Sequence, residues 1–98
     1  MKINKAKEND CLTIALEGRL DTMTAPQLDA ELQGAYEGVK SLVFDFKKLA
    51  YISSAGLRIL LAAQKIMSKQ GSMVIKNSCA EIREIFDVTG FSDILTLK

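Results

Sequence analysis

Residues 42–57 decide the fold, and they read LVFDFKKLAYISSAGL. The segment Leu42–Phe46 is nearly all apolar, as is typical of a strand covered on both faces, and its one charged residue, Asp45, is expected near the strand's end. A strand exit at Ile52 then leads into a pair of serines, from which a helix is expected to run to about Lys69. A buried strand followed by a helix indicates an α/β domain.

The segment before this strand has the alternating pattern of a β-hairpin. Leu12, Ile14 and Leu16 alternate with less apolar residues, which predicts a half-buried strand. The run Glu8-Asn9-Asp10 predicts a turn that connects this strand to a short first strand near Lys2 to Lys7. The chain is therefore expected to open with two antiparallel strands.

Capping residues mark the starts of three expected helices. The first begins with a capping box formed by Thr24 and Gln27 and continues to Gly38. The second presents one apolar face, made of Gly56, Ile59, Leu60, Ala63 and Met67. The third begins with a capping box formed by Ser78 and Glu81.

Short strands complete an expected order of β-β-α-β-α-β-α-β. Met73–Ile75 is a short buried strand, and Ile94–Leu97 is interpreted as the last strand. Strands that alternate with helices after a hairpin predict a mixed, partly parallel sheet of about five strands, packed by three or more helices. Residues 1–98 are expected to form one domain, because no stretch has the composition of a linker or a second core.

The composition argues against several classes of protein. The 98 residues are 48% apolar and 26% charged, and the formal net charge of +1 comes without a basic stripe, so nucleic-acid binding has no electrostatic footprint. The longest apolar stretch, Ile59–Ala63, is far shorter than the roughly 20 residues that span a bilayer. The N-terminus also lacks a signal-peptide core, and we therefore expect a cytoplasmic protein with no direct membrane insertion.

The residues that conventional catalysis needs are scarce. The chain has no histidine, so neither a Ser-His nor a Cys-His pair can activate a nucleophile. No glycine-rich phosphate loop occurs, so the chain is not expected to bind ATP itself. Cys11 and Cys79 form no CxxC pair and are expected to be reduced packing residues, and no metal or other cofactor is predicted. A small Ser-Lys hydrolase is the enzyme alternative, disfavoured because no lysine adjoins the serine pair in the sequence.

Two loops at the carboxyl ends of strands are the expected functional region, Gly18–Thr24 and Lys47–Ser54. Ser53 and Ser54 stand at a helix start, where free backbone N–H groups and the positive end of the helix dipole would stabilise a phosphate. The hydroxyl of such a residue faces outward, where another protein can reach it. The simpler alternative is that one serine only caps the helix.

Specific motifs occur in the serine loop and on both sides of it. The second strand is followed by Gly18-Arg19-Leu20-Asp21, the serine loop is Ile52-Ser53-Ser54-Ala55-Gly56-Leu57-Arg58, and the third helix ends with Ile85-Phe86-Asp87-Val88-Thr89-Gly90-Phe91. Together with the central strand, these segments resemble the G-x-L-D motif, the signature segment, and the last long helix with its glycine exit of the STAS-domain anti-sigma-factor antagonists, which are bacterial signalling proteins. The order of elements agrees over essentially the whole chain.

The resemblance implies a phosphorylation switch at Ser54. In that family the serine two residues before the glycine is phosphorylated by a partner that is both kinase and anti-sigma factor, and this partner brings the nucleotide and Mg²⁺. The unmodified antagonist captures the kinase and frees a sigma factor, while a PPM-type phosphatase later restores it. The partner-binding residues expected in this chain, from the resemblance and from the exposed side of the second helix, are Asp21, Thr22, Asp45, Ser53, Ser54, Ala55, Gly56, Arg58 and Leu61.

The chain departs from the family pattern on both sides of Ser54. Many members have an aspartate before the phosphorylated serine and a hydroxyl residue after it, where this chain has Ser53 and Ala55. Ser53 is therefore a second candidate phosphosite. The alternative function within the family is an unphosphorylated, stand-alone STAS adaptor of a lipid-transport ABC complex, in which the same surface would grip an ATPase.

Asp21 and Asp45 each have two interpretations. The resemblance puts both carboxylates at strand ends beside Ser54, where they would shape the site or orient the serine without acting as catalytic groups. The alternative is that Asp21 hydrogen-bonds nearby loop amides and that Asp45 ends a strand next to solvent.

Leu61 is a residue of the second helix that a core role does not explain. At about 100° per residue, Leu61 lies well away from the apolar face of that helix. With Ala62 it predicts an exposed apolar patch, rimmed by Arg58 and Lys65, that a partner could contact. The alternative is that Leu61 is one of the single exposed leucines that are common on protein surfaces.

Overall fold

The computed structural model describes residues 1–98 as a four-stranded sheet with three α-helices and one short 3-10 helix. In chain order the elements are β1 Lys2–Glu8, β2 Cys11–Leu20, α1 Ala25–Leu32, β3 Ser41–Ile52, α2 Ser54–Gln70, β4 Ser72–Lys76, α3 Ala80–Thr89 and η1 Phe91–Asp93. The strands lie in the order β1-β2-β3-β4, with β1 antiparallel to β2 and the other neighbouring pairs parallel. The expected α/β fold, with its hairpin and mixed sheet, is confirmed.

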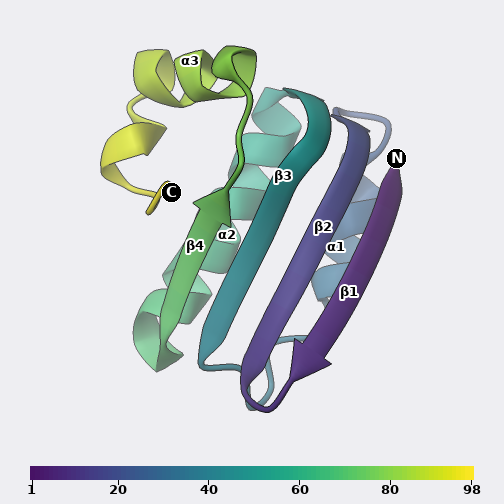
Figure 1. The fold of residues 1–98 in the computed structure, drawn as a ribbon, viewed down its shortest axis with the longest axis vertical. Helices are drawn as coiled ribbons and strands as arrows, with labels where there is room; N and C mark the ends of the chain where they lie inside the picture. The colour runs from purple at the N-terminus through teal and green to yellow at the C-terminus, as the bar shows by residue number, and fades with distance from the viewer.

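Helices α1 and α2 cover one face of the sheet, and α3 lies beyond the end of β4 (Figure 1). On β3, Leu42, Phe44 and Phe46 are buried in the core, whereas Val43 and Asp45 are only half-buried on the opposite face. The expectation that this strand is covered on both faces is therefore wrong. Helices α1 and α2 lie on the core face, so burial alternates along this part of the strand as in a one-sided sheet.

The two edges of the sheet differ in what borders them. Strand β1 forms one edge and exposes Lys2, Lys5 and Lys7, and the ammonium of Lys5 lies 2.8 Å from the carboxylate of Glu31 on α1. Beside β4, at the other edge, the C-terminal residues run along only part of the strand. The β1 edge is therefore lined by lysine side chains, and the β4 edge is partly covered by the last residues of the chain.

The expected fifth strand at Ile94–Leu97 does not form. The 3-10 helix η1 takes up the preceding residues, and the chain then meets β4 only at a single bridge between Ile75 and Leu97. The N–H of Ile75 donates to the carbonyl of Thr96, and the N–H of Lys98 donates to the carbonyl of Ile75, both at 2.9 Å. The apolar pattern that predicted a strand instead reflects the burial of Leu95 in the core.

Both expected capping boxes are absent as well. Thr24 is the N-cap of α1 but makes no side-chain cap bond, and the amide of Gln27 donates to the carbonyl of Met1 at 3.2 Å. At α3 the N-cap is Cys79, and the Ser78 hydroxyl has no hydrogen-bond partner. Helix α1 also ends at Leu32, earlier than expected.

The first turn of α2 packs closely against the ends of β2 and β3 at Gly56. A Cβ atom added to this glycine would lie 2.7 Å from Leu20 Cγ and 2.8 Å from Ile52 Cγ1. Both neighbours are fully buried, so neither side chain can turn into solvent to make room. Glycine is needed here for close approach, and this approach positions the start of α2.

We expect Gly56→Ala to lower the free energy of unfolding by about 1–3 kcal/mol, because the added methyl group overpacks the junction. This loss opposes a gain of up to about 1 kcal/mol from the better helix propensity of alanine. Urea denaturation measures the net change. The matched control is Ser68→Ala on the exposed side of α2, which should shift stability by no more than about 0.5 kcal/mol. A Gly56→Ala protein as stable as the wild type would contradict the packing argument.

Candidate functional site

Ser53 and Ser54 occupy the junction between β3 and α2. The backbone N–H of Ser53 donates to the carbonyl of Leu20 at 2.8 Å, and the N–H of Leu57 donates to the carbonyl of Ser53 at 3.0 Å. The junction is thus held by the end of β2 on one side and by the first turn of α2 on the other. Ser54 is the first residue of α2 and is exposed.

The two hydroxyl groups have different surroundings. Ser53 is the N-cap of α2, yet its side chain makes no cap hydrogen bond, and its Oγ is shielded from solvent without a partner. The simple interpretation of a serine as a side-chain cap therefore has no hydrogen bond to support it. The N–H groups of Ser54, Ala55 and Gly56 come before the first intrahelical donor, the N–H of Leu57, and point out of the helix end, where an anion would be stabilised.

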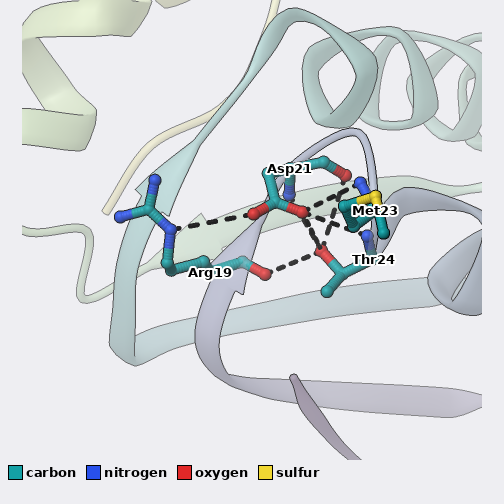
Figure 2. Close-up of polar contacts among 4 residues, drawn as sticks. All are labelled: Arg19, Asp21, Met23 and Thr24. Atoms are coloured by element: carbon teal, nitrogen blue, oxygen red, sulfur yellow. Dashed lines mark hydrogen bonds and ion pairs between the residues drawn. The ribbon is translucent and has the colours of Figure 1, made fainter.

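Asp21 organises the neighbouring loop between β2 and α1 (Figure 2). Its Oδ1 accepts hydrogen bonds from the N–H groups of Met23 at 3.0 Å and Thr24 at 3.1 Å. The hydroxyl of Thr24 accepts from the N–H of Asp21 at 2.9 Å and donates to the carbonyl of Arg19 at 2.7 Å. The bond from the Thr24 N–H is the largest cause that lowers the pKa of Asp21. The interpretation of Asp21 as a ligand of loop amides matches this geometry.

Asp45 is not at a strand end. Strand β3 continues past it to Ile52, and Asp45 pairs there with Ala15 of β2 and Lys76 of β4. Its Oδ1 accepts from the side-chain amide of Asn77 at 3.1 Å and from the N–H of Lys47 at 3.0 Å. The bond from Asn77 is the largest cause that lowers the pKa of Asp45.

The position of Asp45 corrects two expectations. The region from Lys47 to Ile52, expected as a loop, is strand, because β3 stays paired with β2 across two register shifts. Asp45 therefore braces the turn after β4, and a role in partner binding remains a prediction. Only Ser53 separates β3 from α2, so the functional loop on this side is shorter than the sequence indicated.

A groove runs between α1 and α2, starting next to Ser54. Its volume is about 420 Å³, and its lining residues are Thr22, Ala25, Pro26, Asp29, Ala55, Arg58, Ile59 and Ala62. A second hollow of about 280 Å³ shares Asp29, Ile59 and Ala62 with it, so the depression continues along both helices. Three of the predicted partner-binding residues, Thr22, Ala55 and Arg58, are brought together here.

Leu61 lies outside this groove. It is half-buried and is not part of the hydrophobic core, whereas Ala62 is exposed and lines the groove. The main apolar surface beside Ser54 is therefore the groove. The patch expected around Leu61 contributes less of it. Whether Leu61 touches a partner remains a prediction.

Sequence reasoning missed one pair at the end of β2. The guanidinium carbon of Arg19 lies 4.4 Å from the centroid of the Tyr51 ring, and Arg19 Nε lies 3.7 Å from Asp21 Oδ2. The available signal was a cation inside the G-x-L-D motif. Its aromatic neighbour could not be identified without the register of β2 and β3.

Metal-binding clusters, thiols and membrane-spanning helices are other features that could give the chain a function. No cluster of three or more histidine, cysteine, aspartate or glutamate residues is arranged to hold a metal ion. Cys11 and Cys79 are free thiols, and both are half-buried, so Cys79 is a packing residue that solvent still reaches. None of the helices has the length and apolar character needed to cross a bilayer.

Comparisons with known proteins agree on one family. A family model described as "Mlab, STAS domain" matches residues 3–96. A Bordetella bronchiseptica protein provisionally named anti-sigma factor antagonist BtrV is 38% identical over 96% of this chain and 83% of its own length. The Bacillus subtilis anti-sigma-B factor antagonist is 32% identical over 100% of this chain and 93% of its own length.

A solved structure supports the same fold. The Bacillus cell fate determinant SpoIIAA, in its phosphorylated form, superimposes with a TM-score of 0.77 at 19% identity, covering 99% of this chain and 91% of that one. The family match spans nearly all of the chain, and both sides of the serine junction lie within it. The chain belongs to the STAS domain family.

Proposed function

We propose that this protein is an anti-sigma-factor antagonist in a bacterial partner-switching pathway and that Ser54 is its phosphoacceptor. Without phosphate it binds a kinase-type anti-sigma factor, and phosphorylation releases it. The observation that carries the proposal is the contrast between two adjacent serines. The Ser54 residue is exposed at the uncapped N-terminus of α2, whereas the Ser53 oxygen is shielded. The names of the two curated relatives support the same role.

The chemistry requires only a nucleophilic oxygen from this chain. The anti-sigma factor brings ATP and Mg²⁺, and Ser54 Oγ attacks the γ-phosphorus as the bond to ADP breaks and the hydroxyl proton passes to a base of the kinase. The product phosphate can accept hydrogen bonds from the free N–H groups of the first turn of α2. A PPM-type phosphatase then restores the hydroxyl by hydrolysis, with water supplying the oxygen of the released phosphate.

Charge explains why the modification would break a complex. The phosphate adds about −1.5 to −2 charges at neutral pH, which turns the formal net charge of +1 to about zero or slightly negative. Arg58 lies one helical turn after Ser54, on the same side of α2, so the phosphate would offset the cation that borders the groove. A dianion placed at the rim of an apolar groove also has to lose solvent when a partner closes over it.

The first experiment identifies the partner. The tagged protein is purified from its host, and bound proteins and phosphosites are mapped by mass spectrometry. The proposal requires an anti-sigma factor with a kinase domain and a phosphopeptide that contains Ser54. Recovery of an ABC-type ATPase together with unmodified Ser54 would instead support the lipid-transport adaptor and would contradict the proposal.

We expect the recovered kinase to phosphorylate Ser54 as the main site, because its hydroxyl is exposed and the neighbouring N–H groups favour an anion. The measurement is phosphosite mapping after incubation with kinase and ATP. The matched controls are Ser53→Ala, which should still incorporate phosphate, and Ser54→Ala, which should not. Phosphate found chiefly on Ser53, Thr22 or Thr24 would show that the assignment is wrong.

The fold should tolerate changes at Ser54 better than binding does. Since no side-chain cap bond is lost, Ser54→Ala should change the free energy of unfolding by no more than about 0.5 kcal/mol, as for other surface sites. Ser54→Asp should keep a similar melting temperature but weaken partner binding, because it places a negative charge on the contact surface. Thermal melts and calorimetric titration measure the two effects. Equal affinity of Ser54→Asp and wild type would count against a charge-driven release.

The surface of α2 beside Ser54, with Arg58 in the groove and Leu61 outside it, should contribute to docking through charge and apolar contact. Arg58→Glu should slow association with the anti-sigma factor, and Leu61→Ala should mainly speed dissociation. Both variants should stay folded, because neither residue belongs to the hydrophobic core. Surface plasmon resonance gives both rates, with thermal melts in parallel. Wild-type rates in both variants would exclude this helix face.

A further inference from the structure

A second arginine borders the serine junction, at the end of β2. Arg19 is followed by Leu20, whose carbonyl accepts the N–H of Ser53 at 2.8 Å. Strand register pairs Arg19 with Tyr51 and pairs the next residue of each strand, Leu20 with Ile52. The latter two are buried, so the alternation of strands turns the side chains of Arg19 and Tyr51 toward the open face.

The guanidinium of Arg19 is held from two sides. Its Cζ lies 4.4 Å from the centroid of the Tyr51 ring, and its Nε lies 3.7 Å from Asp21 Oδ2. Asp21 is itself fixed by the N–H groups of Met23 and Thr24. Stacking and ion pairing restrict a long side chain that otherwise loses much conformational entropy when it binds. We refer to Arg19, Asp21 and Tyr51 as the Arg19 clasp.

The clasp leaves the outer edge of the guanidinium free. The Arg19 side chain is 61% exposed despite its two contacts. Figure 2 shows its two terminal nitrogens pointing away from Asp21. The N–H groups on that edge form a planar fork that matches the two oxygens of a carboxylate. Arginine and tyrosine are also, with tryptophan, the residue types enriched among those that dominate binding energy at interfaces.

We propose that the Arg19 clasp binds a carboxylate of the anti-sigma factor and so helps to select that partner, an inference that rests on the proposed function. A protein that reaches the Ser54 hydroxyl must come close to the end of β2, because Leu20 is hydrogen-bonded to the residue before Ser54. A nucleic-acid phosphate is a poor alternative, since the formal net charge is only +1. The competing ligand is the chain's own phosphate on Ser54, and the test separates the two.

The test compares affinities of variants for the anti-sigma factor that co-purifies with the wild-type chain, using unphosphorylated protein. Arg19→Glu should raise Kd by at least about tenfold and slow association. Arg19→Lys, which keeps the charge but loses the planar fork, should lose affinity by a smaller factor. Tyr51→Phe keeps an aromatic face and should bind like the wild type, whereas Tyr51→Leu should bind more weakly.

The matched control is Lys69→Glu, which changes the charge by the same amount in the last turn of α2 and should leave Kd within about twofold of the wild type. A partner variant with its contacting carboxylate changed to arginine should restore binding to Arg19→Glu. The comparison is repeated in the Ser54→Ala background, where no phosphate can form. Loss of affinity there supports a partner carboxylate.

Each remaining outcome counts against a specific claim. If Arg19→Glu lowers the affinity of the wild-type chain but not that of the Ser54→Ala chain, the guanidinium serves the chain's own phosphoserine and the inference is overturned. If wild type and Arg19→Glu bind equally well, the clasp has no part in partner selection, and the proposed function still stands. If the wild-type chain binds no anti-sigma factor, the proposed function fails, and the inference fails with it.

Discussion

The structure depends on how closely α2 approaches the ends of β2 and β3 at Gly56. A Cβ atom there would come within 3.0 Å of the side chains of Leu20 and Ile52, so only glycine permits the observed contact. The contact places the first turn of α2 where Ser53 can donate to the carbonyl of Leu20. The position of the Ser54 hydroxyl, the mouth of the groove and the end of β2 all follow from this one packing constraint.

The loop after β2 is ordered by its own hydrogen bonds. The carboxylate of Asp21 accepts from two backbone N–H groups, and the Thr24 hydroxyl links that loop back to the carbonyl of Arg19. A loop that is already ordered by hydrogen bonds loses less conformational entropy when a protein docks on it. The same carboxylate also faces Arg19, so one residue joins the backbone geometry of the loop to the electrostatics of the surface.

Sequence patterns predicted the elements with strong periodicity and missed features that depend on strand register. The hairpin, the buried strand beginning at Leu42 and the long helix after Ser53 were predictable from alternation and helical spacing. Asp45 was predicted at a strand end because the Lys47-Lys48 pair after it has the composition of a loop. Strand β3 continues through this pair because it remains hydrogen-bonded to β2. The apolar run near Leu95 indicates a buried segment, but burial alone does not distinguish a strand from an irregular segment. The stacking of Arg19 on Tyr51 follows from pairing across two register shifts, which no local pattern encodes.

The borders of the sheet have a consequence for how the protein can associate. An unpaired strand edge is a template for another extended chain, and lysine side chains along an edge oppose such β-augmentation. Strand β1 carries three lysines, and β4 has part of its outer edge occupied by the bridge from Leu97. Intermolecular sheet extension is therefore disfavoured at both ends of the sheet. A partner protein can therefore contact the helices and loops of this chain without the exposed backbone groups of the sheet recruiting a second copy into a continuous sheet.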